Sequence, residues 1–278
     1  MATSDPTSAT SPPPPPPFRP ALLVIDFQQD FCPPHGSLAV PGGRDITPVV
    51  NALLASPSFA LRIATRDWHP ADHVSFASNH HTVSSDGSSK EQKRPFVDTV
   101  AIANPLNPEE VIESRLWPVH CVQNTPGAEL VPELDAARLD RVVDKGMDKR
   151  VEMYSPFFDP FRTSPAAPAT DATVANSTTT SQQGARGAVC DSGLAALLAS
   201  HAVTDVYVVG LAADYCVQSA AADAAGLGYA TYVVEDGTRP VDAAAWADTG
   251  RRELEAKGVR LVRMRDAEIT RLDGLGEW

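Results

Sequence analysis

The sequence predicts an α/β fold: a three-layer α-β-α sandwich with a mainly parallel sheet of about six strands. Two observations support this class. Short apolar runs alternate along the chain with segments of helical spacing, and each run is nearly continuous instead of alternating with polar residues. Strands of that kind are typical of a parallel sheet that is covered by helices on both faces. The 278 residues, 43% of them hydrophobic, suffice for one large domain or two small ones.

The first half of the chain supplies three strands and one helix. Residues 21–25, Ala-Leu-Leu-Val-Ile, form a continuous apolar run and predict the first strand. Apolar side chains recur at helical spacing over residues 46–54, and residues 61–65 predict a second strand. A third, shorter strand is expected at residues 141–143.

The second half repeats this alternation. Leucines on one face indicate a helix at residues 190–201, and the β-branched run at 206–209 is the clearest strand of the chain. Small residues at helical spacing follow over residues 216–227, where Gly226 and Gly228 mark the end of the helix. The last three predicted elements are a strand at residues 230–234, a helix at 242–257 and a strand at 259–262.

Two segments of low complexity fall outside this pattern. Residues 1–19 contain six consecutive prolines and predict a disordered tail, and a passive tail is favoured over a ligand for an SH3-type domain. Residues 163–187 are rich in Ala, Ser, Thr and Gln and predict a disordered surface insertion. We therefore expect a domain over residues 20–278 that carries this insertion, with a polar, irregular stretch at about residues 78–94.

Composition and charge exclude some classes of binding partner and indicate the cellular compartment. A net charge of −12 without clustered Lys and Arg argues against nucleic-acid binding, and no apolar run approaches the roughly 18 residues of a membrane helix. The N-terminus lacks the pattern of a secretory signal. Four widely spaced cysteines do not form a disulfide framework, which favours a reducing compartment. We expect a cytoplasmic protein without membrane or nucleic-acid partners; a nuclear or peroxisomal pool and a homo-oligomer are left open.

Cys216 lies where the clearest predicted strand gives way to a helix. Unpaired backbone N–H groups and the positive end of the helix dipole lower the pKa of a thiol in such a position. The functional interpretation is a thiolate nucleophile. The structural interpretation is a small buried residue that packs the first helical turn.

Three further reactive side chains occupy the same kind of position. Asp26, Asp67 and Lys145 each follow a predicted strand, as Cys216 does. Ligands bind beyond the carboxyl ends of the strands in such folds, and parallel strands end at one edge of the sheet, so these side chains should converge. Each alone could be a loop residue or a helix cap. Together they provide a nucleophile, a cation and a proton acceptor.

The motif Asp67-Trp-His69 suggests a metal site. Residues two apart on an extended segment point the same way, so this carboxylate and this imidazole can share one ligand. His120 could supply a third donor, and two histidines with a carboxylate form an open metal site. Taken alone, the D-x-H pattern is usually incidental. The other candidate histidines are expected to be exposed loop residues: His73, His80 and His81.

Five ordered blocks of the chain resemble the nicotinamidases and pyrazinamidases of the isochorismatase-like cysteine hydrolases. The resemblance covers about residues 20–275, apart from the insertion. The blocks are residues 21–43 (ALLVIDFQQDFCPPHGSLAVPGG), 64–80 (ATRDWHPADHVSFASNH), 116–130 (LWPVHCVQNTPGAEL), 143–159 (VDKGMDKRVEMYSPFFD) and 209–229 (VGLAADYCVQSAAADAAGLGY).

The resemblance implies a catalytic triad and a metal centre. The corresponding residues are Asp26, Lys145 and Cys216 for the triad, and Asp67, His69 and His120 for the metal. The implied cofactor is one divalent ion, with zinc as the first choice and manganese or iron as alternatives.

The resemblance also implies how the substrate is held. The corresponding substrate-binding residues are Phe31, Trp117, Tyr154 and Leu211, and the backbone N–H groups of Ala212 and Cys216 correspond to the oxyanion hole. A non-proline cis peptide is implied between Leu211 and Ala212. The chain departs from the family pattern at Asn124, in the loop after His120, where glycine is usual.

The activity implied by the resemblance is the hydrolysis of nicotinamide to nicotinate and ammonia through a thioester, which would feed NAD salvage. The alternatives are a related amidase that acts on a carbamoyl or ureido substrate and a non-catalytic member that binds a metabolite. Phe31, Trp117 and the metal cluster favour a flat, nitrogen-bearing ring. Isochorismatase activity itself is less favoured, because that ether hydrolysis does not need a cysteine nucleophile.

Overall fold

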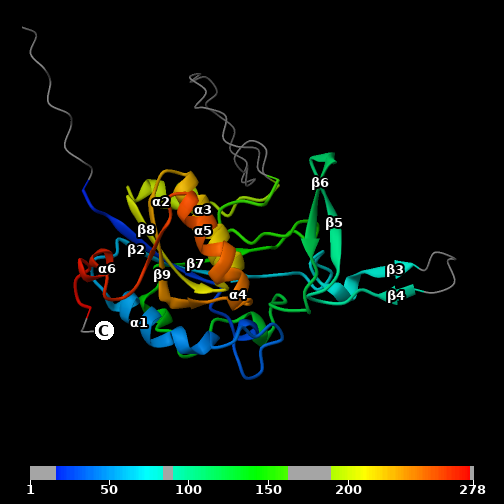
Figure 1. The fold of residues 1–278 in the computed structure, drawn as a ribbon, viewed down its shortest axis with the longest axis horizontal. Coiled ribbons are helices and arrows are strands. Elements are labelled where there is room, and N and C mark those ends of the chain that lie inside the picture. The colour runs from blue at the N-terminus through cyan, green and yellow to red at the C-terminus, as the bar shows by residue number, and fades with distance from the viewer. Residues whose placement is uncertain (1–16, 84–89, 162–188, 276–278) are drawn as a thin grey trace, which may run out of the picture.

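The computed structural model of the chain describes residues 17–83, 90–161 and 189–275, which Figure 1 draws as a ribbon. The predicted insertion at 163–187 and residues 1–16 of the predicted tail lie outside the described residues. The end of that tail contacts the domain, because Arg271 Cζ lies 4.1 Å from the centroid of the Phe18 ring. Within the described ranges, no helix is long and apolar enough to cross a membrane.

A six-stranded sheet forms the centre of the molecule, and its strand order is β10-β9-β8-β1-β2-β7. Every neighbouring pair in it is parallel. The strands are β1 (Pro20–Ile25), β2 (Leu61–Asp67), β7 (Arg141–Lys145), β8 (Asp205–Leu211), β9 (Ala230–Arg239) and β10 (Arg260–Val262). All six coincide with strands predicted from the sequence, and the α/β class is confirmed.

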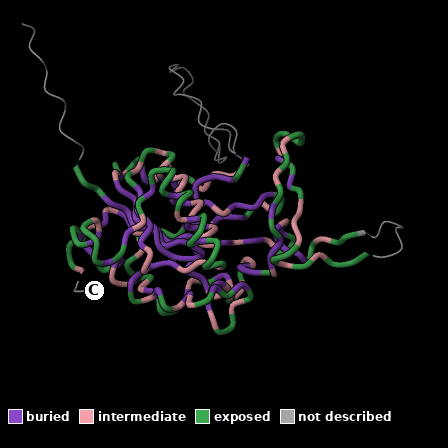
Figure 2. The backbone as a smooth tube through the Cα atoms, viewed as in Figure 1, coloured by how far each residue is buried: buried purple, intermediate pink, exposed green. Residues whose placement is uncertain are grey.

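Side chains of each strand alternate between two hydrophobic cores. In β1, Leu22 and Val24 belong to one core, whereas Leu23 and Ile25 belong to the other. The helices that contribute to the first core are α1 (Thr47–Ala55) and α6 (Ala267–Thr270), and those that contribute to the second are α2 (Leu194–Ser200), α3 (Gln218–Gly226) and α5 (Arg251–Ala256). Figure 2 shows the buried strands between these two layers, so the three-layer arrangement is confirmed.

The predicted helices differ from the observed ones at their starts. The helix expected at 216–227 begins earlier, with a π-helical turn at Ala213–Val217 that continues into α3. Cys216 therefore lies inside the first turn instead of starting the helix. The helix expected at 242–257 consists of α4 (Ala243–Ala245), a π-helical turn at Trp246–Gly250 and α5, and the one expected at 190–201 begins only with α2.

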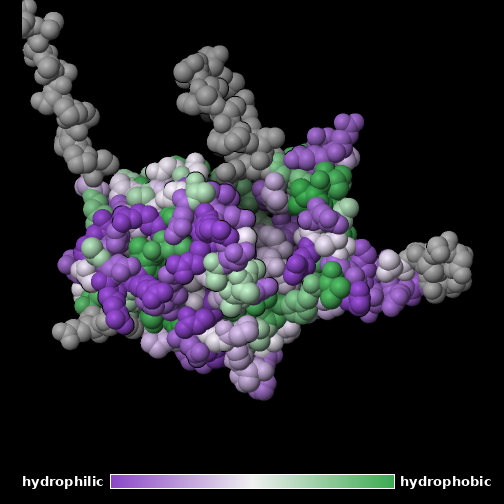
Figure 3. Space-filling view, in the orientation of Figure 1, coloured by the Kyte–Doolittle hydropathy of each residue, from purple (hydrophilic) through white to green (hydrophobic). Residues whose placement is uncertain are grey.

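The chain segment that connects β2 to β7 contains two antiparallel hairpins, which were not predicted. They project away from the central sheet (Figure 1). They consist of β3 (His81–Val83) with β4 (Lys90–Gln92), and of β5 (Thr99–Asn104) with β6 (Asn107–Arg115). The first hairpin falls in the stretch that was expected to be irregular. Leu106 and Val111 of the second hairpin are exposed, and Figure 3 shows a hydrophobic patch there on a mostly hydrophilic face.

Candidate active site

Adjacent strands bring the four predicted reactive side chains together. Asp67 and Lys145 end β2 and β7 and are register partners, while Asp26 directly follows β1. Cys216 lies in the turn after β8, which is the other neighbour of β1. Because these four strands are adjacent and parallel, their carboxyl ends meet at one edge of the sheet, as the sequence predicted.

Lys145 is the centre of this cluster and is almost completely buried. Its Nζ lies 2.9 Å from Asp26 Oδ2, 2.5 Å from Asp67 Oδ1 and 3.5 Å from Cys216 Sγ, and it donates to the carbonyl of Met153 at 3.1 Å. Burial alone would lower the pKa of Lys145, but the two carboxylates together raise it well above its ordinary value. The ammonium group is therefore permanently charged beside the thiol.

Asp26 is a buried carboxyl group whose orientation is fixed by Thr65. The Thr65 hydroxyl donates to Asp26 Oδ1 at 2.6 Å, and the backbone N–H of Asp26 donates to the same hydroxyl at 3.0 Å. Burial raises the pKa of Asp26 to about 6, against the opposing charge of Lys145. A carboxyl group with this pKa is ionised at neutral pH and can still take up a proton during a reaction.

Cys216 is buried, with 6% of the residue exposed, and its thiol lies close to Asp26 and Lys145. Burial raises the pKa of this thiol well above its ordinary value, although the charge of Lys145 acts in the opposite direction. The expectation of a lowered pKa from the helix terminus is wrong, because desolvation outweighs the dipole at this buried position. Burial therefore favours the protonated thiol, and a base is needed to remove the proton.

Asp67, His69 and His120 form a second cluster that shares Asp67 with the first. One ligand atom from each of the three lies within 4.8 Å of the others. Asp67 Oδ2 is 3.6 Å from His69 Nε2 and 3.9 Å from His120 Nε2, while the other oxygen of Asp67 faces Lys145. The predicted metal ligands therefore converge on one point.

Backbone carbonyl groups set the orientation of both imidazoles. His69 Nδ1 lies 2.8 Å from the Gly146 carbonyl oxygen, and His120 Nδ1 lies 2.8 Å from that of Pro118. These contacts favour Nδ1–H as the donor in each ring, so that Nε2 is directed toward Asp67 and its lone pair is available when the neutral ring binds a cation. Among the described residues, the buried Nε2 of His69 has no hydrogen-bond partner. This donor set fits a divalent cation.

The three remaining candidate histidines lie outside the set of Asp67, His69 and His120, although His73 forms a second close group with His69 and Glu152. His73 is fully buried, so its expected exposure is wrong; its ring stacks on that of His69 with centroids 4.0 Å apart. Both of its ring nitrogens are engaged, by Ser75 Oγ at 2.8 Å and by the Val151 carbonyl at 3.1 Å. His80 Nε2 lies 2.7 Å from the Val74 carbonyl, and His81 is exposed in β3.

Gly146 supports His69 and was not singled out in the sequence. Its φ is +66°, and a Cβ at this position would lie 2.4 Å from His69 Cε1. Only glycine combines the left-handed backbone with this close approach.

We expect Gly146→Ala to lower the free energy of unfolding by more than about 1 kcal/mol and to weaken metal binding about 10-fold or more, because His69 must move. Thermal unfolding and metal titration test this. Gly258→Ala is the matched control, since Gly258 has φ +82° and no atom lies within 4 Å of the place that its Cβ would take. The control should lose stability alone. Equal metal affinity in both variants would show that the Gly146 contact does not position His69.

A cavity of about 30 Å³ lies against Cys216 and both clusters. Its lining residues are Phe31, Leu38, Val40, Asp67, Trp117, His120, Glu152, Tyr154, Ala212, Tyr215, Cys216 and Val241. Phe31, Trp117 and Tyr154, which the resemblance implies as substrate-binding residues, thus line this cavity. Leu211 does not line this cavity, because its side chain is buried in the hydrophobic core.

Three aromatic residues form one wall of this cavity. Trp117 Nε1 donates to the Tyr154 hydroxyl at 3.0 Å, and the rings of Trp117 and Tyr215 meet edge to face with centroids 4.9 Å apart. The Tyr154 and Tyr215 centroids are 5.5 Å apart. Such a rigid apolar wall suits a flat ring.

Glu152 and Tyr215 were missed by the sequence analysis. Glu152 is a buried carboxyl group whose Oε1 accepts the backbone N–H of Met153 at 2.9 Å, and burial raises its pKa. It follows no strand, so only the fold brings it to the site. Tyr215 precedes the nucleophile and could have been found as its sequence neighbour.

The backbone before Cys216 has the predicted unusual form, since the Leu211–Ala212 peptide bond is cis. The Ala212 carbonyl accepts the N–H groups of Tyr215 and Val217, each at 3.1 Å. The loop after His120 contains a left-handed residue at the position where the sequence departs from the family pattern. Asn124 adopts φ +62°, a left-handed conformation that asparagine tolerates better than most residues.

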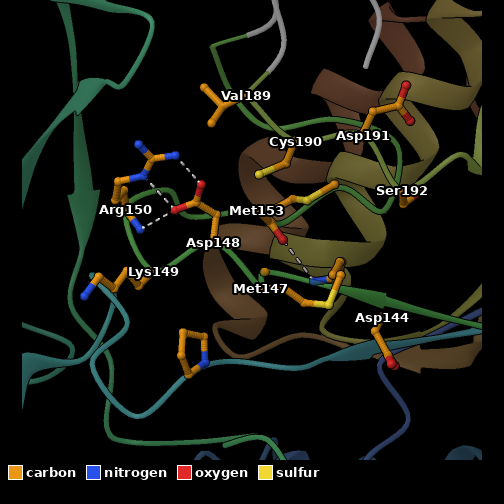
Figure 4. A pocket seen from close by; sticks show the side chains of 13 residues that line it. Asp144, Met147, Asp148, Lys149, Arg150, Met153, Val189, Cys190, Asp191 and Ser192 are labelled. Carbon is orange, nitrogen blue, oxygen red and sulfur yellow. Dashed lines mark hydrogen bonds and ion pairs between the residues drawn. The ribbon is translucent and has the colours of Figure 1, made fainter. Parts of the chain in front are cut away.

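A larger cavity of about 570 Å³ also borders Lys145 (Figure 4). Asp148 and Arg150 face each other in it through contacts of 2.9 and 2.6 Å, and Cys190 lies opposite them. Of the residues predicted for the site, it contains only Lys145. The smaller cavity, which is lined by Cys216, Asp67 and His120, is therefore the candidate active site.

Comparisons with known proteins agree with this geometry. A model of the isochorismatase domain matches residues 20–160 and 162–266 of the chain. The nicotinamidase of Acinetobacter baylyi is 33% identical over 246 residues, which are 88% of this chain and 93% of that protein.

Two solved structures are informative about ligands. The yeast nicotinamidase bound to the inhibitor nicotinaldehyde superposes with a TM-score of 0.70 at 31% identity, covering 88% of this chain and 99% of that one. The pyrazinamidase of Pyrococcus horikoshii in complex with zinc superposes with a TM-score of 0.57 at 28% identity, again over 88% and 99%.

Proposed function

The chain belongs to the isochorismatase family, and we propose that it is a nicotinamidase, which hydrolyses nicotinamide to nicotinate and ammonia. The observation that carries this proposal is the position of Lys145 between Asp26, Asp67 and Cys216, beside a narrow aromatic cavity. This arrangement places a thiol, a proton acceptor and a cation around one point where a carboxamide can lie. The nicotinate released would feed NAD salvage.

The first half of the proposed reaction forms a thioester. Asp26 accepts the proton of the Cys216 thiol, and Lys145 stabilises the resulting negative charges. The sulfur attacks the carboxamide carbon, and the backbone N–H groups of Ala212 and Cys216 hold the developing oxyanion, each worth roughly 3 kcal/mol in other hydrolases. Protonated Asp26 then transfers its proton to the leaving nitrogen as ammonia departs.

The second half regenerates the thiol. A water molecule enters beside Asp26, which again accepts a proton as the water attacks the thioester carbon. The carbon–sulfur bond breaks, nicotinate forms and the sulfur recovers its proton from Asp26. The pKa of Asp26, raised to about 6, suits a group that alternates between base and acid near neutral pH.

Asp67, His69 and His120 would hold one divalent metal ion, and we propose zinc. When bound, the ion offers an open coordination position to the pyridine nitrogen and so orients the ring. Phe31 and Trp117 would pack on the ring, and Tyr154 would fix Trp117 through its hydroxyl. We no longer propose that the Leu211 side chain contacts the substrate. Its proposed role is that of the residue before Ala212, whose backbone N–H belongs to the oxyanion hole.

The direct test is ammonia release from nicotinamide by the purified full chain, with and without a chelator. Turnover that depends on metal supports the proposal. Release of ammonia from a carbamoyl or ureido substrate, but not from nicotinamide, would favour the related amidase activity. Binding of nicotinamide without any turnover would indicate a non-catalytic member of the family.

We further propose that residues 20–278 carry the activity and that it operates in the cytoplasm. The four cysteines are free, and a nucleophilic thiol is best preserved in a reducing compartment.

Deleting residues 1–16, or replacing residues 164–186 with a short Gly/Ser linker, should change kcat/KM less than about threefold. Composition is the reason, because neither segment has enough apolar residues to form a core by itself. The N-terminal deletion keeps Phe18, whose ring contacts Arg271. Thermal unfolding of both variants is the control, and a large loss of stability would show that the deleted segment packs on the domain.

A further inference from the structure

Phe96 has a backbone conformation that its side chain does not favour. It lies between β4 and β5 with φ +65°, in the left-handed region that a bulky residue rarely adopts. Its side chain does not gain burial in return, because the residue is 45% exposed. Glycine or asparagine would fit this backbone better, so the aromatic ring needs another explanation.

Hydrogen bonds hold the turn around Phe96 in this form. The Asp98 carboxylate accepts the backbone N–H of Arg94 at 2.6 Å, and the backbone N–H of Asp98 donates to the Arg94 carbonyl at 3.1 Å. The Phe96 N–H donates to the Leu116 carbonyl at 2.7 Å, and the Leu116 N–H donates to the Asp98 carbonyl at 3.0 Å. The turn is therefore bonded to the residue that directly precedes Trp117.

The ring of Phe96 meets the ring of Trp117 edge to face, with centroids 5.7 Å apart and an interplanar angle of 88°. Trp117 is 3% exposed, and its ring also contacts Tyr154 and Tyr215 within the cavity wall. Phe96 does not itself line the cavity. Phe96 thus packs against the Trp117 ring without lining the cavity.

We propose that Phe96 is a positioning residue for substrate binding: it fixes the Trp117 ring at the angle that fits a flat substrate ring. This inference rests on the proposed function, in which Trp117 packs on the nicotinamide ring. The unfavourable backbone at Phe96 persists because the surrounding hydrogen bonds impose it, and the ring it presents restricts the motion of Trp117. Such a residue contributes to substrate affinity and not to the chemical step.

The test compares Phe96→Gly, Phe96→Asn and Phe96→Tyr in the full, metal-loaded chain. Phe96→Gly and Phe96→Asn relieve the backbone and remove the ring, so we expect KM for nicotinamide to rise about fivefold or more, with kcat within about twofold. Their thermal midpoints should equal or exceed that of the wild type. Phe96→Tyr keeps the ring and should keep KM within about twofold.

Val97→Ala is the matched control, because Val97 is the next residue, is 62% exposed and should leave KM unchanged. Nicotinamide affinity measured calorimetrically in a Cys216→Ala background should fall with Phe96→Gly by the same factor as KM rises. An unchanged KM in Phe96→Gly would overturn the inference. A fall in the thermal midpoint of more than about 5 °C in both Phe96→Gly and Phe96→Asn would also overturn it, because it would show that Phe96 stabilises the fold. Absence of nicotinamide turnover in the wild type would instead overturn the proposed function, and this inference with it.

Discussion

Replacing Cys216 with alanine should lower nicotinamide turnover by several orders of magnitude while the protein remains folded. Among the described residues that line the cavity, the thiol is the group that can form the proposed thioester, and no neighbouring side chain there can replace it as a nucleophile. Alanine fits the helical turn at Ala213–Val217 and removes only the sulfur atom, so the thermal midpoint should change by a few degrees at most. Ammonia release and thermal unfolding measure the two effects.

The matched controls are the other three cysteines. Cys32→Ala, Cys121→Ala and Cys190→Ala should retain activity, since none of these thiols lines the proposed active site. Nicotinaldehyde, the inhibitor bound in the yeast relative, should inhibit the wild type by forming a thiohemiacetal and should bind Cys216→Ala much more weakly. More than about a tenth of the wild-type activity in Cys216→Ala would contradict the covalent mechanism.

Removing the metal should reduce nicotinamide turnover strongly and benzamide turnover little. Benzamide has nearly the same shape and the same carboxamide as nicotinamide but lacks the ring nitrogen, so it should be a poor substrate from the outset. Pyrazinamide keeps a nitrogen at the matching position and should be accepted. Chelation or His120→Ala should therefore shrink the difference between nicotinamide and benzamide, because the proposed ion would orient the ring through its nitrogen.

Metal content, measured by elemental analysis of each variant, gives a readout that is independent of activity. His81→Ala is the control, because this histidine is exposed and lies outside the cluster, so it should keep both metal and turnover. A metal that polarised the carbonyl would depress nicotinamide and benzamide alike. An equal loss for both substrates would therefore exclude the orienting role. Undiminished activity without metal would show that the three ligands are structural.

The central sheet could be predicted because its strands are buried on both faces. Such strands appear in the sequence as continuous apolar runs, as in residues 21–25 and 206–209. The β5–β6 hairpin could not be predicted in the same way. Most of β6 is exposed or only partly buried, and its sequence, Asn-Pro-Glu-Glu-Val-Ile-Glu-Ser-Arg, has the composition of a loop.

The reactive residues could be predicted because each follows a strand, and parallel strands deliver such residues to one edge. Properties that depend on how the folded chain packs could not be predicted from the sequence. The pKa of Cys216 was expected to be low from its helix position, but burial reverses the direction. The contact of Gly146 with His69 joins two segments that are distant in the sequence, so it could not be predicted. Glu152 lines the cavity although it does not follow a strand, so its position gave no signal either.

The burial of Cys216 has a consequence for the survival of the protein under oxidative stress. Peroxide reacts with thiolates that are open to solvent, whereas Cys216 is a buried residue, burial raises the pKa of its thiol, and the cavity that it lines has a volume of only about 30 Å³. We therefore expect slow inactivation by hydrogen peroxide and by bulky alkylating reagents. Burial also raises the pKa of Cys190, to about 11, but this residue is partly exposed and lines the larger cavity, so reagents should reach and modify it first without loss of turnover. If Cys216 is the nucleophile, this enclosure would protect it from the irreversible steps of cysteine oxidation.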